Sequence, residues 1–186
     1  SPEGNISLSI AFADREFDVP ISIATGILVK DALTEVFNLD SIKLKWPNDL
    51  VFEKKKIGGI LVEKEVFSNY TKAIVGIGIN LELDKKESWW GDFGDLNGKN
   101  LRDKIINKIL VKFEALFRNG LNDWKNLWNQ SCIHNDAIIS VARNDEIIKG
   151  KYLGINDSGE LLLEKKIGGI ISFSSGEVSI KGIYNK

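Results

Sequence analysis

The sequence predicts an α+β fold, in which a mixed sheet with packed helices is followed by a small β-barrel. Up to about residue 134, strand-like segments alternate with segments whose apolar residues follow the three- and four-residue spacing of a helix. Beyond that point, five short strand-like segments follow within about fifty residues, separated by turn sequences such as residues 156–159 (NDSG). We therefore predict two domains, residues 1–134 and residues 135–186.

The individual elements follow from the spacing of apolar residues. Five strands are expected in the first domain, over residues 5–12, 42–46, 49–52, 57–64 and 71–81. Three helical segments are expected there, over residues 19–37, 101–118 and 123–128. Pro20 suits the first turn of the first helix, and Asn100 is the expected N-cap of the second. Five strands are expected in the second domain, over residues 137–141, 146–155, 160–164, 169–173 and 177–180.

Two connections in the first domain are conspicuous. Lys54, Lys55 and Lys56 are expected to form a basic turn between two strands. Residues 82–100 are polar and contain several glycines, so we expect a loop. Trp89 and Trp90 in this loop could cover a ligand, although packing of the loop is the simpler interpretation.

The composition describes a chain that can fold but carries no strong charge. Of the 186 residues, 43% are hydrophobic, which excludes wholesale disorder, and 25 basic residues against 26 acidic ones give a net charge of −1. We expect no nucleic-acid binding by this chain, because it lacks a basic excess. No apolar run reaches the roughly 18 residues that span a bilayer, so no membrane association is expected. The single cysteine, Cys132, fits a reducing cytoplasm.

Three segments carry candidate chemistry, and each also has an ordinary structural interpretation. Residues 76–80 (GIGIN) lack the third glycine of a dinucleotide-binding fingerprint, because Leu81 stands there. Their alternating glycines indicate either a bare strand face for a flat ligand or a close strand crossing. Residues 43–49 (KLKWPND) offer groups for phosphates and a metal-bound water, or an ordinary strand–turn–strand. Residues 56–59 (KIGG) offer a cation beside bare backbone, or a solvated lysine run.

The hexapeptide KKIGGI occurs twice, at residues 55–60 and 165–170, so alone it is weak evidence. Only the first copy is preceded by KWPND and followed by GIGIN. The context therefore assigns the chemistry to Lys56 and not to Lys166. One histidine and one cysteine in the whole chain do not support a metal site or a Cys–His nucleophile.

Taken together, KWPNDLVF, KKIGGILVE and AIVGIGINL, in this order and at these separations, resemble the catalytic core of the biotin protein ligases. Residues 1–5 are similar to the segment that follows the biotin-binding arm of that family, and residues 20–37 to the helix before KWPND. Residues 176–181 resemble the end of its small C-terminal domain. The resemblance covers nearly the whole chain. It implies a class II synthetase-like core followed by an SH3-like β-barrel.

The resemblance also implies an ATP-dependent ligase that works in two steps. The carboxylate of biotin attacks the α-phosphate of MgATP, which gives biotinyl-5'-AMP and pyrophosphate. A lysine of the biotin carboxyl carrier protein of acetyl-CoA carboxylase then attacks the adenylate. ATP, biotin and Mg²⁺ are the implied cofactors, and a homodimer is a possible assembly.

Site residues are carried over where this sequence matches the motifs of the family. Lys56 matches the lysine that contacts the biotin carboxylate and the adenylate phosphate, so it is the expected catalytic residue. Asp49 is expected to brace the turn. The expected biotin-binding residues are Lys56, Gly58, Gly59 and Gly76. The expected ATP- and adenylate-binding residues are Lys45, Asn48, Gly78 and Asn80, with Mg²⁺ near Asn48 and no side-chain cluster of its own.

Other interpretations stay open. The Gly- and Arg-rich arm of the family should precede Ser1, so we expect a fragment that is weak or inactive by itself. A non-catalytic ligand-sensing or dimerising fragment of a biotin-operon repressor is one alternative. A lipoate or octanoate ligase on the same fold is another, and the KWPND and GIGIN segments argue against it.

Overall fold

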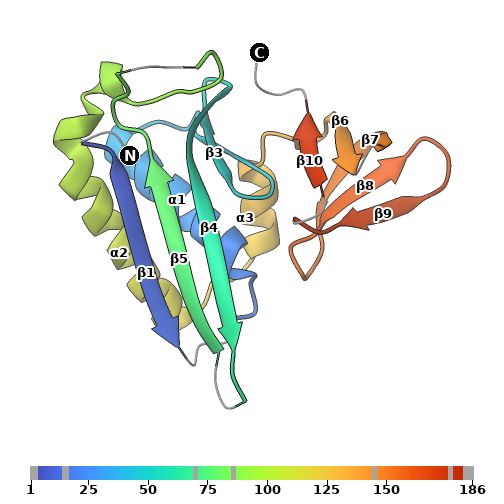
Figure 1. Ribbon diagram of the computed structural model, residues 1–186, viewed down its shortest axis with the longest axis horizontal. Coiled ribbons are helices and arrows are strands. Elements are labelled where there is room, and N and C mark those ends of the chain that lie inside the picture. The colour runs from blue at the N-terminus through green and yellow to red at the C-terminus, as the bar shows by residue number, and fades with distance from the viewer. Residues whose placement is uncertain are drawn as a thin grey trace.

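The protein is described here by a computed structural model that covers residues 4–13, 17–68, 71–84, 87–143, 146–175 and 178–181 (Figure 1). The first five strands are β1 (Ile6–Ala13), β2 (Lys43–Lys45), β3 (Asp49–Phe52), β4 (Lys55–Val66) and β5 (Thr71–Ile79). The helices are α1 (Ile21–Phe37), α2 (Arg102–Asn119) and α3 (Trp124–Ser131), with 3₁₀ turns η1 (Gly94–Leu96) and η2 (Gly98–Leu101). The last five strands are β6 (Ile138–Arg143), β7 (Glu146–Ile155), β8 (Leu161–Lys165), β9 (Ile170–Phe173) and β10 (Val178–Lys181).

These strands form two five-stranded sheets, with the orders β1-β5-β4-β3-β2 and β10-β6-β7-β8-β9. Neighbouring strands in both sheets pair antiparallel, and parallel pairing occurs in isolated bridges, such as that between Leu44 and Cys132. The helices belong to the part of the chain before the second sheet, so the predicted α+β fold class is confirmed. The resemblance segments at residues 1–3 and 176–177 lie outside the described residues.

One face of the first sheet is covered by helices, and the other face carries none of the described helices (Figure 1). Helix α2 shows why it packs there: its buried residues recur every three or four positions and form one stripe, made of Ile105, Ile109, Phe113 and Leu116. Helix α1 contacts β4, α2 and α3, which explains why most of its residues are buried. Among the described residues, no helix is both long and apolar enough to cross a bilayer.

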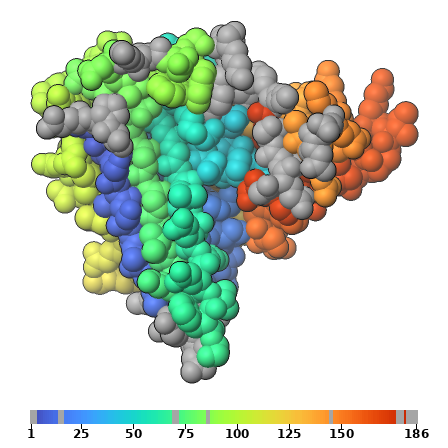
Figure 2. Space-filling view, viewed as in Figure 1, coloured from blue at the N-terminus to red at the C-terminus, as the bar shows by residue number. Residues whose placement is uncertain are grey.

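Strand alternation decides what the open face presents. On β5, Val75, Ile77 and Ile79 are buried against the helices. Gly76 and Gly78 alternate with them and therefore belong to the opposite face of the strand. Gly59 of β4 pairs with Gly78, so two glycines lie side by side on this face. Figure 2 shows β1 in blue, β5 in green and β4 in teal next to one another on it. The open face is therefore low and flat where these glycines meet.

The predicted basic turn is smaller than the sequence suggests. Glu53 and Lys54 alone form it, with φ of 49° and 60°, because two-residue hairpin turns commonly need left-handed backbone at both positions. Lys55 and Lys56 already belong to β4. Lys56 thus takes its direction from a paired strand and not from a loop.

The start of α2 also differs from the prediction. The chain winds through η1 and η2 first, so residues 82–100 are not purely loop. The N-cap position falls on Leu101, which makes no side-chain capping bond. Asn100 donates instead to the Asn97 side chain at 2.7 Å. The prediction of Asn100 as N-cap is therefore wrong.

The junction between the two sheets buries the only histidine of the sequence. His134 is 1% exposed, and neither ring nitrogen has a hydrogen-bond partner among the described residues. Burial, and to a lesser extent the positive charge of Lys45, together lower the pKa of His134 to about 4. The ring is consequently neutral at pH 7.

This burial predicts a pH dependence of stability. The ordinary pKa of histidine is 6.5, and that of folded His134 is about 4. Between these two pH values, His134 binds a proton in the unfolded chain but stays neutral in the folded protein. The free energy of unfolding should therefore fall as the pH drops through this window, by up to about 3 kcal/mol from this residue. His134→Phe should remove that part and leave the contribution of the carboxylates. Urea unfolding of both proteins at pH 7 and pH 4.5 measures the difference, and equal pH dependence would contradict the assignment.

Candidate functional site

A β-bulge in β4 creates the geometry of the site. Leu50 of β3 pairs with Gly58, but the next residue, Val51, pairs with Lys56, so Ile57 is the extra residue. Strict alternation would put Lys56 and Gly59 on opposite faces of the sheet. With the bulge, Ile57 and Gly58 are both buried toward the core. Lys56 and Gly59 then lie together on the open face.

The glycines fall into two groups when a methyl group is added to each in turn. A Cβ on Gly58 would lie 2.4 Å from the carbonyl oxygen of Gly78, so the close approach of two strands requires this glycine. A Cβ on Gly59, Gly76 or Gly78 would meet nothing closer than 3.6 Å, 3.7 Å and 3.9 Å, respectively, which is ordinary contact. Packing therefore explains Gly58 but not the other three. Their missing side chains leave empty space above the sheet.

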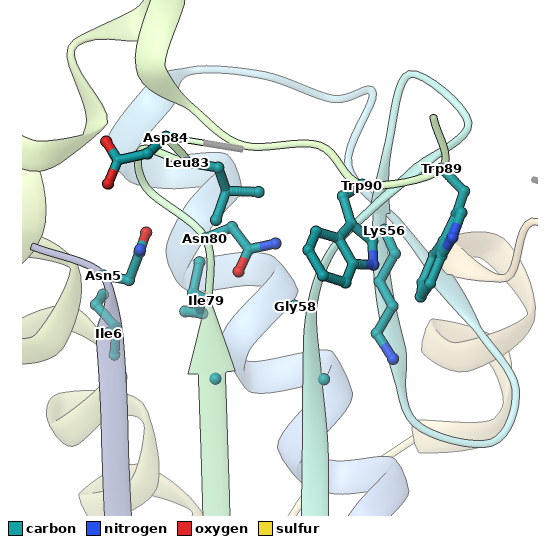
Figure 3. A pocket seen from close by; sticks show the side chains of 12 residues that line it. Asn5, Ile6, Lys56, Gly58, Ile79, Asn80, Leu83, Asp84, Trp89 and Trp90 are labelled. Carbon is teal, nitrogen blue, oxygen red and sulfur yellow. The ribbon is translucent and has the colours of Figure 1, made fainter. Parts of the chain in front are cut away.

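Two adjoining hollows occupy that space. The larger has a volume of 790 Å³ and includes Lys56, Gly58 and Asn80 in its wall (Figure 3). The smaller has a volume of 360 Å³. It is lined by Ser7, Leu8, Ser9, Asn48, Gly59, Ile60, Leu61, Gly76, Ile77 and Gly78. Gly59 and Gly78 border both hollows, so a ligand in one can be joined to a ligand in the other.

Three charged side chains form a cluster beside Gly59. The Lys56 ammonium lies 2.5 Å from one carboxylate oxygen of Asp49, and Lys45 lies 3.5 Å from the other. Asp49 is the strand partner of both Gly59 and Lys45, so Lys45, Asp49 and Gly59 lie in one row across three strands. Burial lowers the pKa of Lys45, and the Asp49 carboxylate opposes that shift. Two cations and one anion leave a net positive charge next to the hollows.

The cluster revises the interpretation of the KWPND residues. Asp49 does more than brace a turn, since its carboxylate forms an ion pair with Lys56. In the sequence, two features indicated this role: Asp49 follows Lys45 by four residues, and it precedes the KKIGG segment. The Lys45 side chain is 10% exposed and is not among the residues that line the two hollows. The Asn48 amide donates to the carbonyl of Ile60 at 2.8 Å, and Asn48 borders the smaller hollow only.

The loop after β5 brings two indole rings to the larger hollow. The backbone N–H of Lys56 donates to the Trp89 carbonyl, and the N–H of Gly91 donates to the Lys56 carbonyl, both at 2.9 Å. The Asn80 side chain donates to the carbonyl of Gly91 at 3.1 Å. Trp89 and Trp90 meet edge to face, with ring centroids 5.4 Å apart, and Trp90 lies between Asn80 and Lys56 in Figure 3. These tryptophans line the site, and their closeness in sequence to GIGIN was the signal for it.

The other copy of the hexapeptide is elsewhere. Lys166 is exposed in the connection between β8 and β9 of the second sheet. None of the described residues of that sheet lines either hollow. Lys56 alone of the two lysines stands with the glycines and the indoles.

Comparison with known proteins gives two family matches. Residues 1–80 match the model described as the biotin/lipoate A/B protein ligase family, and residues 138–181 match that of the biotin protein ligase C-terminal domain. The first match contains Gly59, Gly76 and Gly78, which form the glycine floor of the hollows, and it contains the charged cluster. The second coincides with the sheet that the sequence predicts to be SH3-like.

Individual relatives agree. The bifunctional ligase/repressor BirA of Salmonella typhimurium is 28% identical over 173 residues, covering 88% of this chain and 53% of that protein. Biotin–protein ligase 2 of Arabidopsis thaliana is 26% identical over 181 residues, covering 87% and 55%. The chain thus spans about half the length of the curated relatives it matches.

Solved structures show the same fold. The apo biotin protein ligase of Aquifex aeolicus has a TM-score of 0.75 and 25% identity, covering 96% of this chain and 83% of that one. The complex of that ligase with biotin and ATP has a TM-score of 0.70 and 24% identity, covering 94% and 78%. With both matched parts in order along one chain, and with the motifs and the fold in agreement, the chain is similar to the biotin protein ligases over most of its length.

Proposed function

We propose that the protein activates biotin as biotinyl-5'-AMP with MgATP and transfers it to a lysine of the biotin carboxyl carrier protein of acetyl-CoA carboxylase. One observation carries the proposal: Lys56 lies over Gly59, one of the two glycines that border both hollows. A cation at the junction of two ligand spaces is what the union of a carboxylate with a phosphate requires. The names of the relatives and the Aquifex aeolicus complex with biotin and ATP support it.

We place biotin in the smaller hollow, over Gly59, Gly76 and Gly78. Bare backbone accepts a flat, mostly apolar ligand closely, and the hollow has the size of a small-molecule site. The carboxylate of biotin then reaches toward Lys56. Gly58 contributes backbone to the neighbouring wall, while its own lack of a side chain serves the contact with β5.

We place the adenylate in the larger hollow. An indole offers a flat π-face on which a nucleobase can stack, and two indoles line this space. Asn80 is assigned to the adenine end, and Gly78 to the floor under the joined ligand. Lys45 and Asn48 are assigned to phosphates that extend from this hollow toward the charged cluster, since Asn48 borders the smaller hollow and Lys45 borders neither.

The first step joins two anions. An oxygen of the biotin carboxylate bonds to the α-phosphorus of ATP, the bond to the β-phosphate oxygen breaks, and pyrophosphate leaves. Lys56 offsets the repulsion between the reactants and the charge that builds on the α-phosphate. Asp49 holds the Lys56 ammonium by an ion pair, so the donor is oriented before substrate arrives.

Mg²⁺ would neutralise part of the phosphate charge. This ion usually takes one or two oxygens from protein and the rest from phosphates and water. Among the described residues, no group of three or more His, Cys, Asp or Glu could hold a metal. We therefore assign the ion to ATP, with the side-chain oxygen of Asn48 as the neighbouring protein ligand.

In the second step, the ε-amine of the acceptor lysine attacks the acyl carbon of the adenylate and AMP leaves.

We assign catalysis to residues 1–134 and the small SH3-like domain to residues 135–186. The two sheets share no strand, which supports this division. ATP as substrate and one buried cysteine suit a cytoplasmic protein. A lipoate or octanoate ligase, or a non-catalytic repressor fragment, is not favoured, because the relatives are named as ligases for biotin or as ligase/repressors.

We also propose that the protein forms a homodimer through β4. Pairing with β3 ends at Gly59, so the distal part of β4 is paired on one side only among the described residues. Val66 there is 80% exposed. An open strand edge with an exposed apolar side chain invites a second strand. Sedimentation velocity of the wild-type protein and of Val66→Lys checks whether a dimer forms and weakens.

The assignment of Lys56 predicts that two matched lysine variants lose activity to different extents. In the full-length protein, Lys56→Ala should lower biotin-dependent ATP–pyrophosphate exchange by about 10²-fold or more, the scale of losing one oriented charged donor. Lys166→Ala removes the same residue from the other hexapeptide copy and should leave exchange nearly unchanged. Equal losses in the two variants would refute the assignment.

The glycine analysis predicts a separation of binding from stability. Gly59→Val or Gly76→Val has room in the protein but intrudes on the biotin space, so biotin affinity should fall while the melting temperature changes little. Gly58→Ala should instead lower the melting temperature, because its methyl group meets the Gly78 carbonyl. Calorimetric titration with biotin beside a thermal melt measures both. Unchanged affinity in the Gly59 and Gly76 variants would show that these glycines do not face the ligand.

A further inference from the structure

Part of the KWPND segment is held from the side of the second sheet. Just before this segment, the carbonyl of Leu44 accepts the N–H of Ile133, which lies between α3 and the second sheet, at 2.8 Å. The indole N–H of Trp46, a residue only 1% exposed, donates to the carbonyl of Gly159 at 2.9 Å. Gly159 belongs to the turn between β7 and β8, 113 residues away in sequence. A directional, partly buried bond thus joins the β7–β8 turn to the motif that contains Asp49.

The turn that supplies this carbonyl is built to hold one shape. The Asn156 side-chain oxygen accepts the N–H groups of Ser158 and Glu160 at 3.0 Å and 2.9 Å. Gly159 takes a φ of 77°, which favours glycine. A Cβ on Gly159 would lie 3.0 Å from Pro20, so the turn also packs on the start of α1. Neither its shape nor its position can change without affecting these contacts.

The other end of this connection is the charged cluster. Trp46 is separated from Asp49 by Pro47 and Asn48 only, and β2 and β3 pair Lys45 with Asp49 across the same short hairpin. Asp49 in turn binds the Lys56 ammonium. A shift of Trp46 would therefore move the carboxylate that orients the lysine. Displacements near 1 Å in reacting groups can cost about 10²-fold in rate.

We propose that the β7–β8 turn is a positioning element for the adenylation site. Gly159 holds Trp46, Trp46 holds the β2–β3 hairpin, and the hairpin keeps Asp49 in contact with Lys56. Trp46 is thus a positioning residue, and the second sheet serves the first chemical step although none of its described residues lines the hollows. The proposal rests on the proposed function of Lys56.

The test disrupts the turn far from the ligands. Asn156→Ala removes the two acceptor bonds that shape it. In the full-length protein, kcat of biotin-dependent ATP–pyrophosphate exchange should fall about 10-fold, while the Kd for biotin changes less than about twofold, because the glycine floor is untouched. Asn126→Ala is the matched control: it removes a side-chain bond between two exposed residues, Asn126 and Asp123, neither of which belongs to the β7–β8 turn. Equal kcat in these two variants would overturn the proposal.

A double-mutant cycle distinguishes positioning from general weakening. Trp46→Phe removes the donor of the Gly159 bond, and it should lower kcat as Asn156→Ala does. If both act through one bond, the double variant should lose little more than either single variant. Losses that multiply would mean independent effects and would overturn the coupling.

An NMR measurement separates this proposal from the proposed function. In ¹⁵N spectra, Asn156→Ala should shift the Trp46 indole N–H and the backbone amides of Asn48 and Asp49, and Asn126→Ala should not. If the wild-type protein catalyses no exchange, the proposed function fails, and these shifts still decide the coupling. Shifts confined to the turn around Asn156 would overturn it.

Discussion

The bulge at Ile57 is the constraint on which the rest of the site depends. In a regular strand, Lys56 would point into the core beneath the sheet, where a charged ammonium is costly to bury. One extra residue interrupts the alternation of the strand's two faces, so that two adjacent residues, Ile57 and Gly58, face inward. The same step brings Lys56 over Gly59 and within reach of Asp49. The bulge also requires a glycine at position 58, because the second inward residue meets the Gly78 carbonyl.

Charge and space in the site have separate origins. The space comes from glycines on β4 and β5, whose paired register puts Gly59 beside Gly78. The charge comes from β2, β3 and the start of β4, where Asp49 links two lysines. Because β4 pairs with both β3 and β5, it is the one strand that joins them. Its register therefore controls how far the Lys56 ammonium lies from Gly59, Gly76 and Gly78.

The sequence predicted the fold class and most elements, because apolar periodicity and turn residues act locally. It also indicated Lys56 and the four glycines of the two motifs, through segments that are specific only in combination. It did not distinguish Gly58, whose role depends on a contact with Gly78 twenty residues later, from Gly59, whose role depends on the absence of one. The part played by Asp49 was missed for the same reason: the ion pair with Lys56 forms across strands, and a linear motif shows only that a carboxylate is present. The tryptophans after β5 were undervalued because their position depends on backbone bonds to Lys56.

The two copies of KKIGGI show where local sequence stops deciding structure. In the first copy, Gly58 and Gly59 lie in a strand paired on both sides, with neither at positive φ. In the second, Gly168 and Gly169 take φ of 105° and 77° in the connection between β8 and β9. Glycine permits both conformations at little cost, so the hexapeptide itself prefers neither strongly. The residues around it decide: LVEKEV extends the first copy into a long strand against β5, whereas the second must reverse direction within a short hairpin. In this chain, the lysine followed by two glycines is part of the candidate site in the copy whose backbone neighbouring strands hold flat.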